Sequence, residues 1–147
     1  MCRSVLCVDV NVLVDAHRVD QPGHEVAKSW LDTARRAREP LGIPSIAASG
    51  FLRIVTHPRT FREPTPISVA VDFIERLLKS PASEIVIPAD RHFEIFTSYC
   101  RELALKGNDI PDAYLAGLAV ERGATFVTSD RGFLRFRDLR VVQPGES

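Results

Sequence analysis

The sequence has few of the residues on which several common classes of protein depend. Its 147 residues include three cysteines, one methionine and one tryptophan. Cys2, Cys7 and Cys100 are odd in number and show no CxxC spacing, so the sequence predicts neither a disulfide framework nor a zinc site. Free cysteines suit a reducing compartment, and we expect a cytoplasmic protein.

Long apolar runs are also lacking. The apolar stretch at residues 5–14 is interrupted by Asp9 and Asn11 and has no small-residue cleavage site after it, which is unlike a secretory signal. No later segment approaches the roughly 18 apolar residues of a membrane span. We therefore expect a chain without a membrane partner.

Net charge is absent as well, because Lys+Arg and Asp+Glu both total 19. No overall field attracts a polyanion, so a nucleic-acid surface would have to be a local patch. Sixteen of the basic side chains are arginine, the residue suited to bidentate phosphate contacts, although a coding bias toward arginine explains this equally well.

Three common nucleotide and hydrolase motifs are missing. The sequence has no GxxxxGK[ST], GxGxxG or GxSxG, which argues against a P-loop, a dinucleotide site and a hydrolase nucleophile elbow.

The apolar periodicity that is present predicts short strands alternating with helices in one domain spanning residues 1–147. Strands are expected at residues 4–10, 41–43, 84–87, 124–128 and 140–142, and helices at 12–17, 23–38, 45–55, 67–79, 90–106 and 109–122. The helix at 90–106 would bury Phe93, Phe96, Leu103 and Ala104 and be capped by Gly107. This alternation predicts an α/β fold, with a mostly parallel central sheet of four to five short strands and helices on both faces.

Acidic residues fall where such a sheet gathers its function. Asp9 and Asp130 each follow an expected strand, and Asp112 lies in the first turn of the helix before the second of these strands. Converging carboxylates repel one another unless a cation offsets their charge, and an all-oxygen cluster favours Mg²⁺ and phosphate chemistry. The alternative for Asp112, Asp109 and Asp130 is simple capping or compensation of a helix dipole. Asp9, between two valines, would need a partner to offset its desolvation.

Four segments together resemble a known family. They are VDVNVL at residues 8–13, FLRI at 51–54 followed by THPR at 56–59, PDAYLA at 111–116, and TSDRGF at 128–133. In order and spacing they resemble the PIN-domain ribonucleases, specifically the VapC toxins of toxin–antitoxin pairs. The resemblance implies a PIN-like fold and an endoribonuclease dependent on Mg²⁺ or Mn²⁺. It also implies inhibition by a VapB-type antitoxin and a homodimer.

Carried over residue by residue, the resemblance assigns catalysis and metal binding to Asp9, Asp112 and Asp130. PIN domains commonly place a glutamate where this chain has Gly50, and a further acid where it has Gly132. Asp109, on the same helical face as Asp112, is a candidate substitute for the missing acid.

Other side chains could assist the acids. Asn11 and Ser129 could supply neutral oxygens or orient water. Arg53, Arg59 and Arg131 flank the expected site in sequence and could hold an RNA backbone.

The expected function is metal-assisted hydrolysis of a phosphodiester in a structured RNA such as tRNA or rRNA. Two alternatives remain open. Gly50 and Gly132 would suit a non-catalytic PIN-fold module that binds RNA or protein. The order Asp9, Val10, Asn11, Val12 loosely resembles the strand end of a haloacid-dehalogenase-type phosphatase with Asp9 as nucleophile, although Asn11 stands where that family has its general acid.

Overall fold

The computed structural model of the chain describes residues 5–146 and contains one five-stranded sheet. The strands are β1 (Leu6–Val8), β2 (Leu41–Pro44), β3 (Ser83–Val86), β4 (Thr125–Val127) and β5 (Arg140–Val142). All four pairings are parallel, and the strand order is β3-β2-β1-β4-β5. The α/β class and the parallel sheet are therefore confirmed. Residue 4 of the first expected strand lies outside the described residues.

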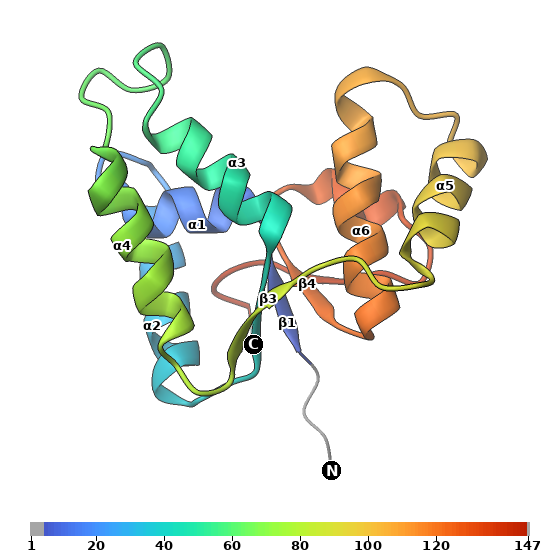
Figure 1. The fold of residues 1–147 in the computed structure, drawn as a ribbon, viewed down its shortest axis with the longest axis horizontal. Coiled ribbons are helices and arrows are strands. Elements are labelled where there is room, and N and C mark those ends of the chain that lie inside the picture. The colour runs from blue at the N-terminus through green and yellow to red at the C-terminus, as the bar shows by residue number, and fades with distance from the viewer. Residues whose placement is uncertain (1–4, 147) are drawn as a thin grey trace.

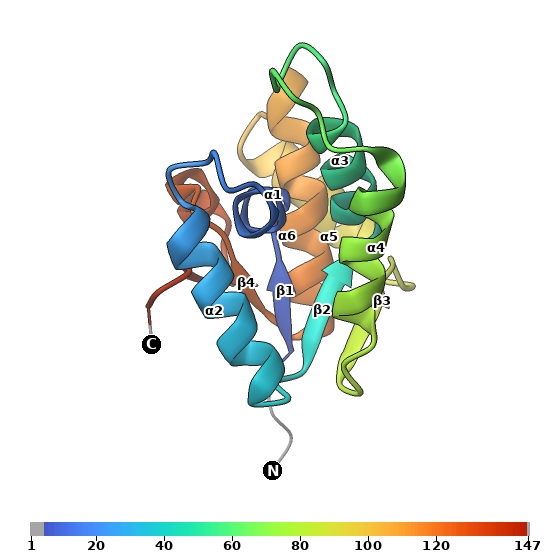
Figure 2. The same cartoon turned by 90° about the vertical axis from the view of Figure 1, so that its left-hand side faces the viewer.

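Helices connect the strands and cover both faces of the sheet. They are α1 (Val10–His17), α2 (His24–Arg36), α3 (Ser45–Val55), α4 (Ile67–Leu78), α5 (His92–Glu102) and α6 (Ile110–Arg122), with short 3₁₀ turns η1 (Gly107–Asp109) and η2 (Arg131–Arg135). The first four helices lie on one face and α5 with α6 on the other (Figures 1 and 2). This follows from right-handed crossovers that first step from β1 to β3 and then return to β4 and β5.

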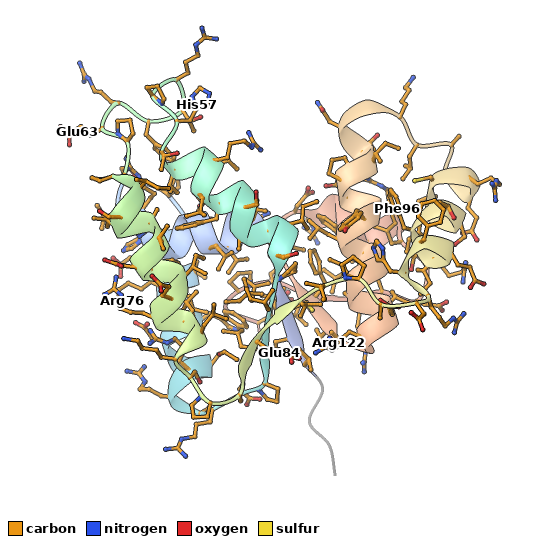
Figure 3. The ribbon with its side chains drawn as sticks, viewed as in Figure 1. His57, Glu63, Arg76, Glu84, Phe96 and Arg122 are labelled. Atoms are coloured by element: carbon orange, nitrogen blue, oxygen red, sulfur yellow. The ribbon has the colours of Figure 1, made fainter. Side chains whose placement is uncertain are left out.

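The short central strands lie in the hydrophobic core. Residues Cys7, Val8 and Ile43 of the central strands have no exposed surface, as expected for a parallel sheet with helices on both faces. In α6, the small side chains of Ala113 and Ala116 are fully buried. The C-terminal end of α6 is held to the sheet by an ion pair between Arg122 and Glu84 of β3 (Figure 3).

The α5 region differs from its prediction. The helix ends at Glu102 rather than at residue 106, because Ala104 adopts a left-handed backbone (φ 49°) and the amide of Leu105 bonds back to the Cys100 carbonyl. This backbone geometry is a standard helix C-terminus, usually built with glycine. Gly107 instead begins η1.

The expected core of this helix is also partly wrong. Phe93 is 71% exposed, and Leu103 and Ala104 are exposed too, whereas Phe96 is half-buried.

Strand β1 ends two residues earlier than predicted. The strand stops at Val8, and Val10 already begins α1, so Asp9 is the N-cap of a helix rather than a residue inside a strand.

None of the helices within residues 5–146 is both long enough and apolar enough to span a membrane.

Candidate metal centre

The expected acids gather at the carboxyl edge of the sheet. Strand connections leave β1 toward β2 on one side, while β4 pairs with β1 on the other, so the strand order reverses between β1 and β4. Such a reversal opens a crevice at the carboxyl ends of parallel strands. Asp9 follows β1, Asp130 follows β4, and Asp112 lies in the first turn of α6, whose N-terminus faces the same edge (Figure 1).

Asp9 is the most buried of these acids, at 5% exposure. Its Oδ1 accepts a hydrogen bond of 2.7 Å from the backbone N–H of Val10, at the N-terminus of α1. Its Oδ2 accepts one of 2.7 Å from the Thr128 hydroxyl and one of 3.2 Å from Asn11 Nδ2. The backbone amide of Asp9 bonds to the carbonyl of Val127, which fixes the residue against β4.

The hydroxyl of Thr128 links two of the acids. Thr128 has no exposed surface, and its Oγ1 donates to Asp9 while accepting from the backbone N–H of Asp130 at 3.0 Å. Asn11 Nδ2 also donates to this oxygen at 3.2 Å. One hydroxyl therefore makes three hydrogen bonds and sets the spacing between the ends of β1 and β4.

The charges of the acids influence one another. Burial raises the pKa of Asp9 to about 6, opposed by the hydrogen bonds from Thr128 and Val10, and the charges of Asp112 and Asp130 add to the rise. Burial also raises the pKa of Asp112, which Arg135 lowers and Asp130 raises. The charges of Asp112 and Asp130 thus act on Asp9, and the charge of Asp130 acts on Asp112.

Arg135 provides part of the opposite charge. Its Nη2 lies 3.3 Å from Asp112 Oδ2 and 3.5 Å from Asp109 Oδ1. A second nitrogen, Nη1, donates to the carbonyl of Gly132, and the guanidinium carbon lies 4.8 Å from the centroid of the Phe136 ring. Asp109 and Asp112 therefore share Arg135 as an ion-pair partner.

Asn11, one of the residues expected to assist the acids, contacts Asp9 directly, and the backbone of Ser129 contacts Asn11. Asn11 bridges Asp9 and Thr128, and its Oδ1 accepts from the backbone N–H of Ser129 at 3.3 Å.

Asp130 caps η2 by accepting from the Gly132 amide at 2.8 Å, so the capping alternative describes a real contact. Capping occupies only one of its two carboxylate oxygens with a protein donor.

Gly50, at the position of the missing acid, lies in α3 beside the first turn of α1. A Cβ added there would be 3.3 Å from Val10 Cγ2, and Val10 directly follows Asp9. A side chain at position 50 would therefore start beside Val10, the residue after Asp9.

The three arginines expected to hold RNA do not pair with the acids among the described residues. Within residues 5–146, the side chains of Arg53, Arg59 and Arg131 form no hydrogen bond or ion pair with Asp9, Asp109, Asp112 or Asp130. The arginine that does so is Arg135.

The donor set suits a hard cation. All the clustered donors are oxygens, and Asp9 has an unfavourable buried charge that a cation would offset. Across the described part of the chain, no group of three or more His, Cys, Asp or Glu side chains lies so that it could hold a metal ion. Mg²⁺ is usually held by only one or two carboxylates together with water and substrate phosphate, so this arrangement fits it.

Sequence reasoning did not single out Thr128 or the contact of Arg135. Thr128 directly follows β4 and begins the sequence TSD, and a hydroxyl at such a strand end is the available signal. The approach of Arg135 to Asp112 depends on η2, a turn that no apolar periodicity indicated.

Comparison with known proteins identifies the family of this arrangement. The family model described as PIN domain matches residues 6–139. "VapC ribonuclease Mb2897" of Mycobacterium bovis is 44% identical over 140 residues, covering 95% of each chain. "Ribonuclease VapC25" of Mycobacterium tuberculosis is 36% identical over 137 residues, covering 93% of this chain and 96% of that one.

Solved structures share the fold at lower identity. VapBC2 from Rickettsia felis, bound to a DNA fragment from its promoter, contains a chain with a TM-score of 0.70 and 15% identity, covering 95% of this chain and 98% of that one. FitAcB from Neisseria gonorrhoeae gives a TM-score of 0.66 and 19% identity, covering 97% of this chain and 99% of that one.

Proposed function

Because this chain belongs to the PIN-domain family and, within it, to the VapC ribonucleases, we propose that it is a single-domain endoribonuclease toxin. It would hydrolyse phosphodiester bonds in a structured RNA with Mg²⁺ or Mn²⁺. The observation that carries this proposal is the buried carboxylate of Asp9, joined through the Thr128 hydroxyl to Asp130 and influenced by the charge of Asp112.

Asp9, Asp112 and Asp130 would hold the divalent ion, with Asp109 as the candidate fourth ligand in place of the acid absent at Gly50. A bound divalent ion supplies an activated water and neutralises charge on the scissile phosphate. The protein needs no nucleophile of its own. Asn11 and Thr128 hold Asp9 in one orientation, which keeps its carboxylate available in a fixed direction.

The RNA would be tRNA or rRNA, cut in an unpaired loop whose bases can be splayed out. Arg53, Arg59 and Arg131 are proposed to hold its phosphates, and Ser129 to orient water near the acids. Among the described residues, no carboxylate of the site pairs with these arginines, which leaves them available for phosphate contacts.

A VapB-type antitoxin would inhibit the toxin by covering the acids and offering an arginine to them. Arg135 supports this idea, because a guanidinium already lies 3.3 Å from Asp112 within the chain. We further propose that the toxin pairs with a second copy of itself. Co-expression with the adjacent upstream reading frame should relieve toxicity and yield a complex that purifies as one species. Absence of toxicity without that partner would count against the toxin assignment.

The direct test is cleavage of tRNA and rRNA by the purified chain, with Mg²⁺, with Mn²⁺ and with EDTA. We expect cleavage only with a divalent ion, and none by a folded Asp9→Asn variant. Tight RNA binding without cleavage under every condition would favour a non-catalytic binding module. Release of phosphate from p-nitrophenyl phosphate, lost in Asp9→Asn, would favour the phosphatase alternative.

A further inference from the structure

A second charged feature lies at the opposite edge of the sheet from the acids. Helices α2 and α4 precede β2 and β3, so their C-termini open toward the amino ends of the strands (Figure 2). Between them is a hollow of about 440 Å³. We call it the basic hollow, after four lining cations: Arg35, Arg36, Arg38 and Lys79.

The cations of the basic hollow have no ion-pair partner in the part of the chain that the structure describes. Within residues 5–146, none of the four forms an ion pair, whereas elsewhere Arg18 pairs with Asp20 and Arg137 pairs with Glu102. Asp32 also lines the hollow, but Lys28 holds its carboxylate at 2.7 Å. The lining of the basic hollow therefore carries more positive than negative side chains.

Arg35 has an unused donor. Its Nε is buried without a hydrogen-bond partner, and its Nη2 makes one long bond of 3.4 Å to the backbone carbonyl of Arg76, a residue labelled on α4 in Figure 3. Buried N–H groups are normally paired, so this unpaired nitrogen is unfavourable, and an outside acceptor would reach it only if the Arg35 side chain moved.

The backbone of Arg38 gives a second, independent observation. Arg38 has a left-handed φ of 54° just after α2, where its amide bonds to the Arg35 carbonyl and the next amide, of Glu39, bonds to the Ala34 carbonyl. This is the helix ending that normally uses glycine at the left-handed position. An arginine there is conformationally less favourable than glycine, as alanine is at Ala104 after α5, and the Arg38 side chain lines the basic hollow.

The helix dipole accounts for part of the pattern, since cations are favoured near helix C-termini. Arg35 and Arg36 already supply two charges in the last turn of α2. The dipole does not require Arg38 as a third cation after the helix, or Lys79 from the other side of the hollow.

We propose that the basic hollow is an exosite that binds the phosphate backbone of a folded RNA outside the segment that is cut. The role as part of a substrate site rests on the proposed ribonuclease function. Arginine forms bidentate contacts with phosphate, and three of the four cations are arginines. Strands of three to four residues separate the two edges by about 10–13 Å. A folded RNA is large enough to contact both.

Binding is measured first, without cleavage. Fluorescein-labelled, unfractionated bacterial tRNA is titrated in EDTA with the wild-type chain and with the triple variant R36Q/R38G/K79Q, and gels check that the RNA stays intact. We expect at least a tenfold loss of affinity. Losing three phosphate contacts should also reduce the slope of log affinity against log salt by about 2 to 3.

The control is R62Q/R91Q/R101Q, which removes three exposed positive charges that do not line the basic hollow. It should keep most of the affinity and salt slope. Equal losses in the two triple variants would overturn the exosite, because they would show only a general charge effect. Unchanged tRNA binding together with loss of the antitoxin complex would assign the surface to a protein partner, and would also overturn it.

R38G alone separates binding from folding. Glycine suits the left-handed position, so this variant should melt no lower than wild type while binding tRNA more weakly. In Mg²⁺, the ratio of kcat/KM for tRNA to kcat/KM for a short single-stranded oligonucleotide should also fall. If the chain cleaves no RNA at all, the binding experiment still decides the basic hollow. If the hollow has no effect on binding, cleavage with Mg²⁺ still decides the proposed function.

Discussion

The Thr128 hydroxyl donates a hydrogen bond of 2.7 Å to Asp9 Oδ2 and so joins the end of β4 to the end of β1. The same oxygen accepts from the backbone N–H of Asp130. Two acids from sequence positions far apart are therefore placed by one buried side chain.

Thr128→Val should disturb this group while keeping the shape of the side chain. The Thr128 hydrogen bond lowers the pKa of Asp9, so its loss should raise that pKa further above its usual range. The variant also leaves buried polar groups without a partner, which costs about 1–3 kcal/mol. Thr128→Ser keeps the hydroxyl and is the control. NMR titration of the Asp9 carboxyl and chemical denaturation measure both effects; equal behaviour of the two variants would contradict the assigned role.

Asp9→Asn should stabilise the metal-free protein at neutral pH. Burial raises the pKa of Asp9 from 3.8 to about 6, so the native state binds the proton more tightly than the unfolded chain. The free energy of unfolding should therefore fall as pH rises from about 4 to 6 and stay low above it, by up to about 3 kcal/mol. The asparagine side chain cannot ionise, so this part of the pH dependence should vanish. Denaturation in EDTA at several pH values measures it, with Asp72→Asn on α4 as the control, and an unchanged pH profile would contradict the shifted pKa.

Gly50→Glu should strengthen divalent-ion binding, because a side chain at position 50 starts beside Val10 and an added carboxylate raises affinity for a hard cation. Gly50→Ala is the control: it gains about 1 kcal/mol of helix preference but must displace Val10, whose Cγ2 would lie 3.3 Å from the new Cβ. We expect the glutamate variant, and not the alanine variant, to lower the Mg²⁺ concentration needed for cleavage. Equal responses would mean that position 50 does not face the ion, leaving Asp109 as the better fourth acid.

Arg135→Gln should make the protein more responsive to Mg²⁺. Arg135 lowers the pKa of Asp112, and its loss leaves the acids with less opposing charge. The pair is partly exposed, so stability in EDTA should change by less than about 1 kcal/mol. The increase in Tm on adding Mg²⁺ should grow, because an ion that binds only the native state stabilises it by mass action. Arg137→Gln, which breaks contacts with Glu102 and Asp138, is the control; a Tm increase no larger than wild type in Arg135→Gln would contradict the prediction.

Much of the fold could be predicted because the central strands are largely buried and read as short apolar runs between helical patterns. The helix at residues 45–55 and the strand at 140–142 have the predicted bounds. The errors lie where backbone geometry decides. Asp9 follows β1 as the cap of α1, and Ala104 ends α5 in a left-handed conformation that its sequence does not favour.

The clustering of the acids could be predicted because parallel strands bring their carboxyl ends to one edge. The roles of Thr128 and Arg135 could not, since their contacts depend on side-chain direction and on the turn η2. The left-handed backbone of Arg38 and its place in the basic hollow could likewise not be predicted from the sequence.

The position of a bound ion is the most direct test of the proposed metal centre. Crystals grown with Mn²⁺ and measured near the manganese absorption edge should show an anomalous peak with oxygens of Asp9 and at least one of Asp112 and Asp130 within about 2 Å. The peak should be absent in crystals of Asp9→Asn. A manganese ion bound elsewhere, or none at millimolar Mn²⁺ while the same protein cleaves RNA, would contradict the assignment of these acids.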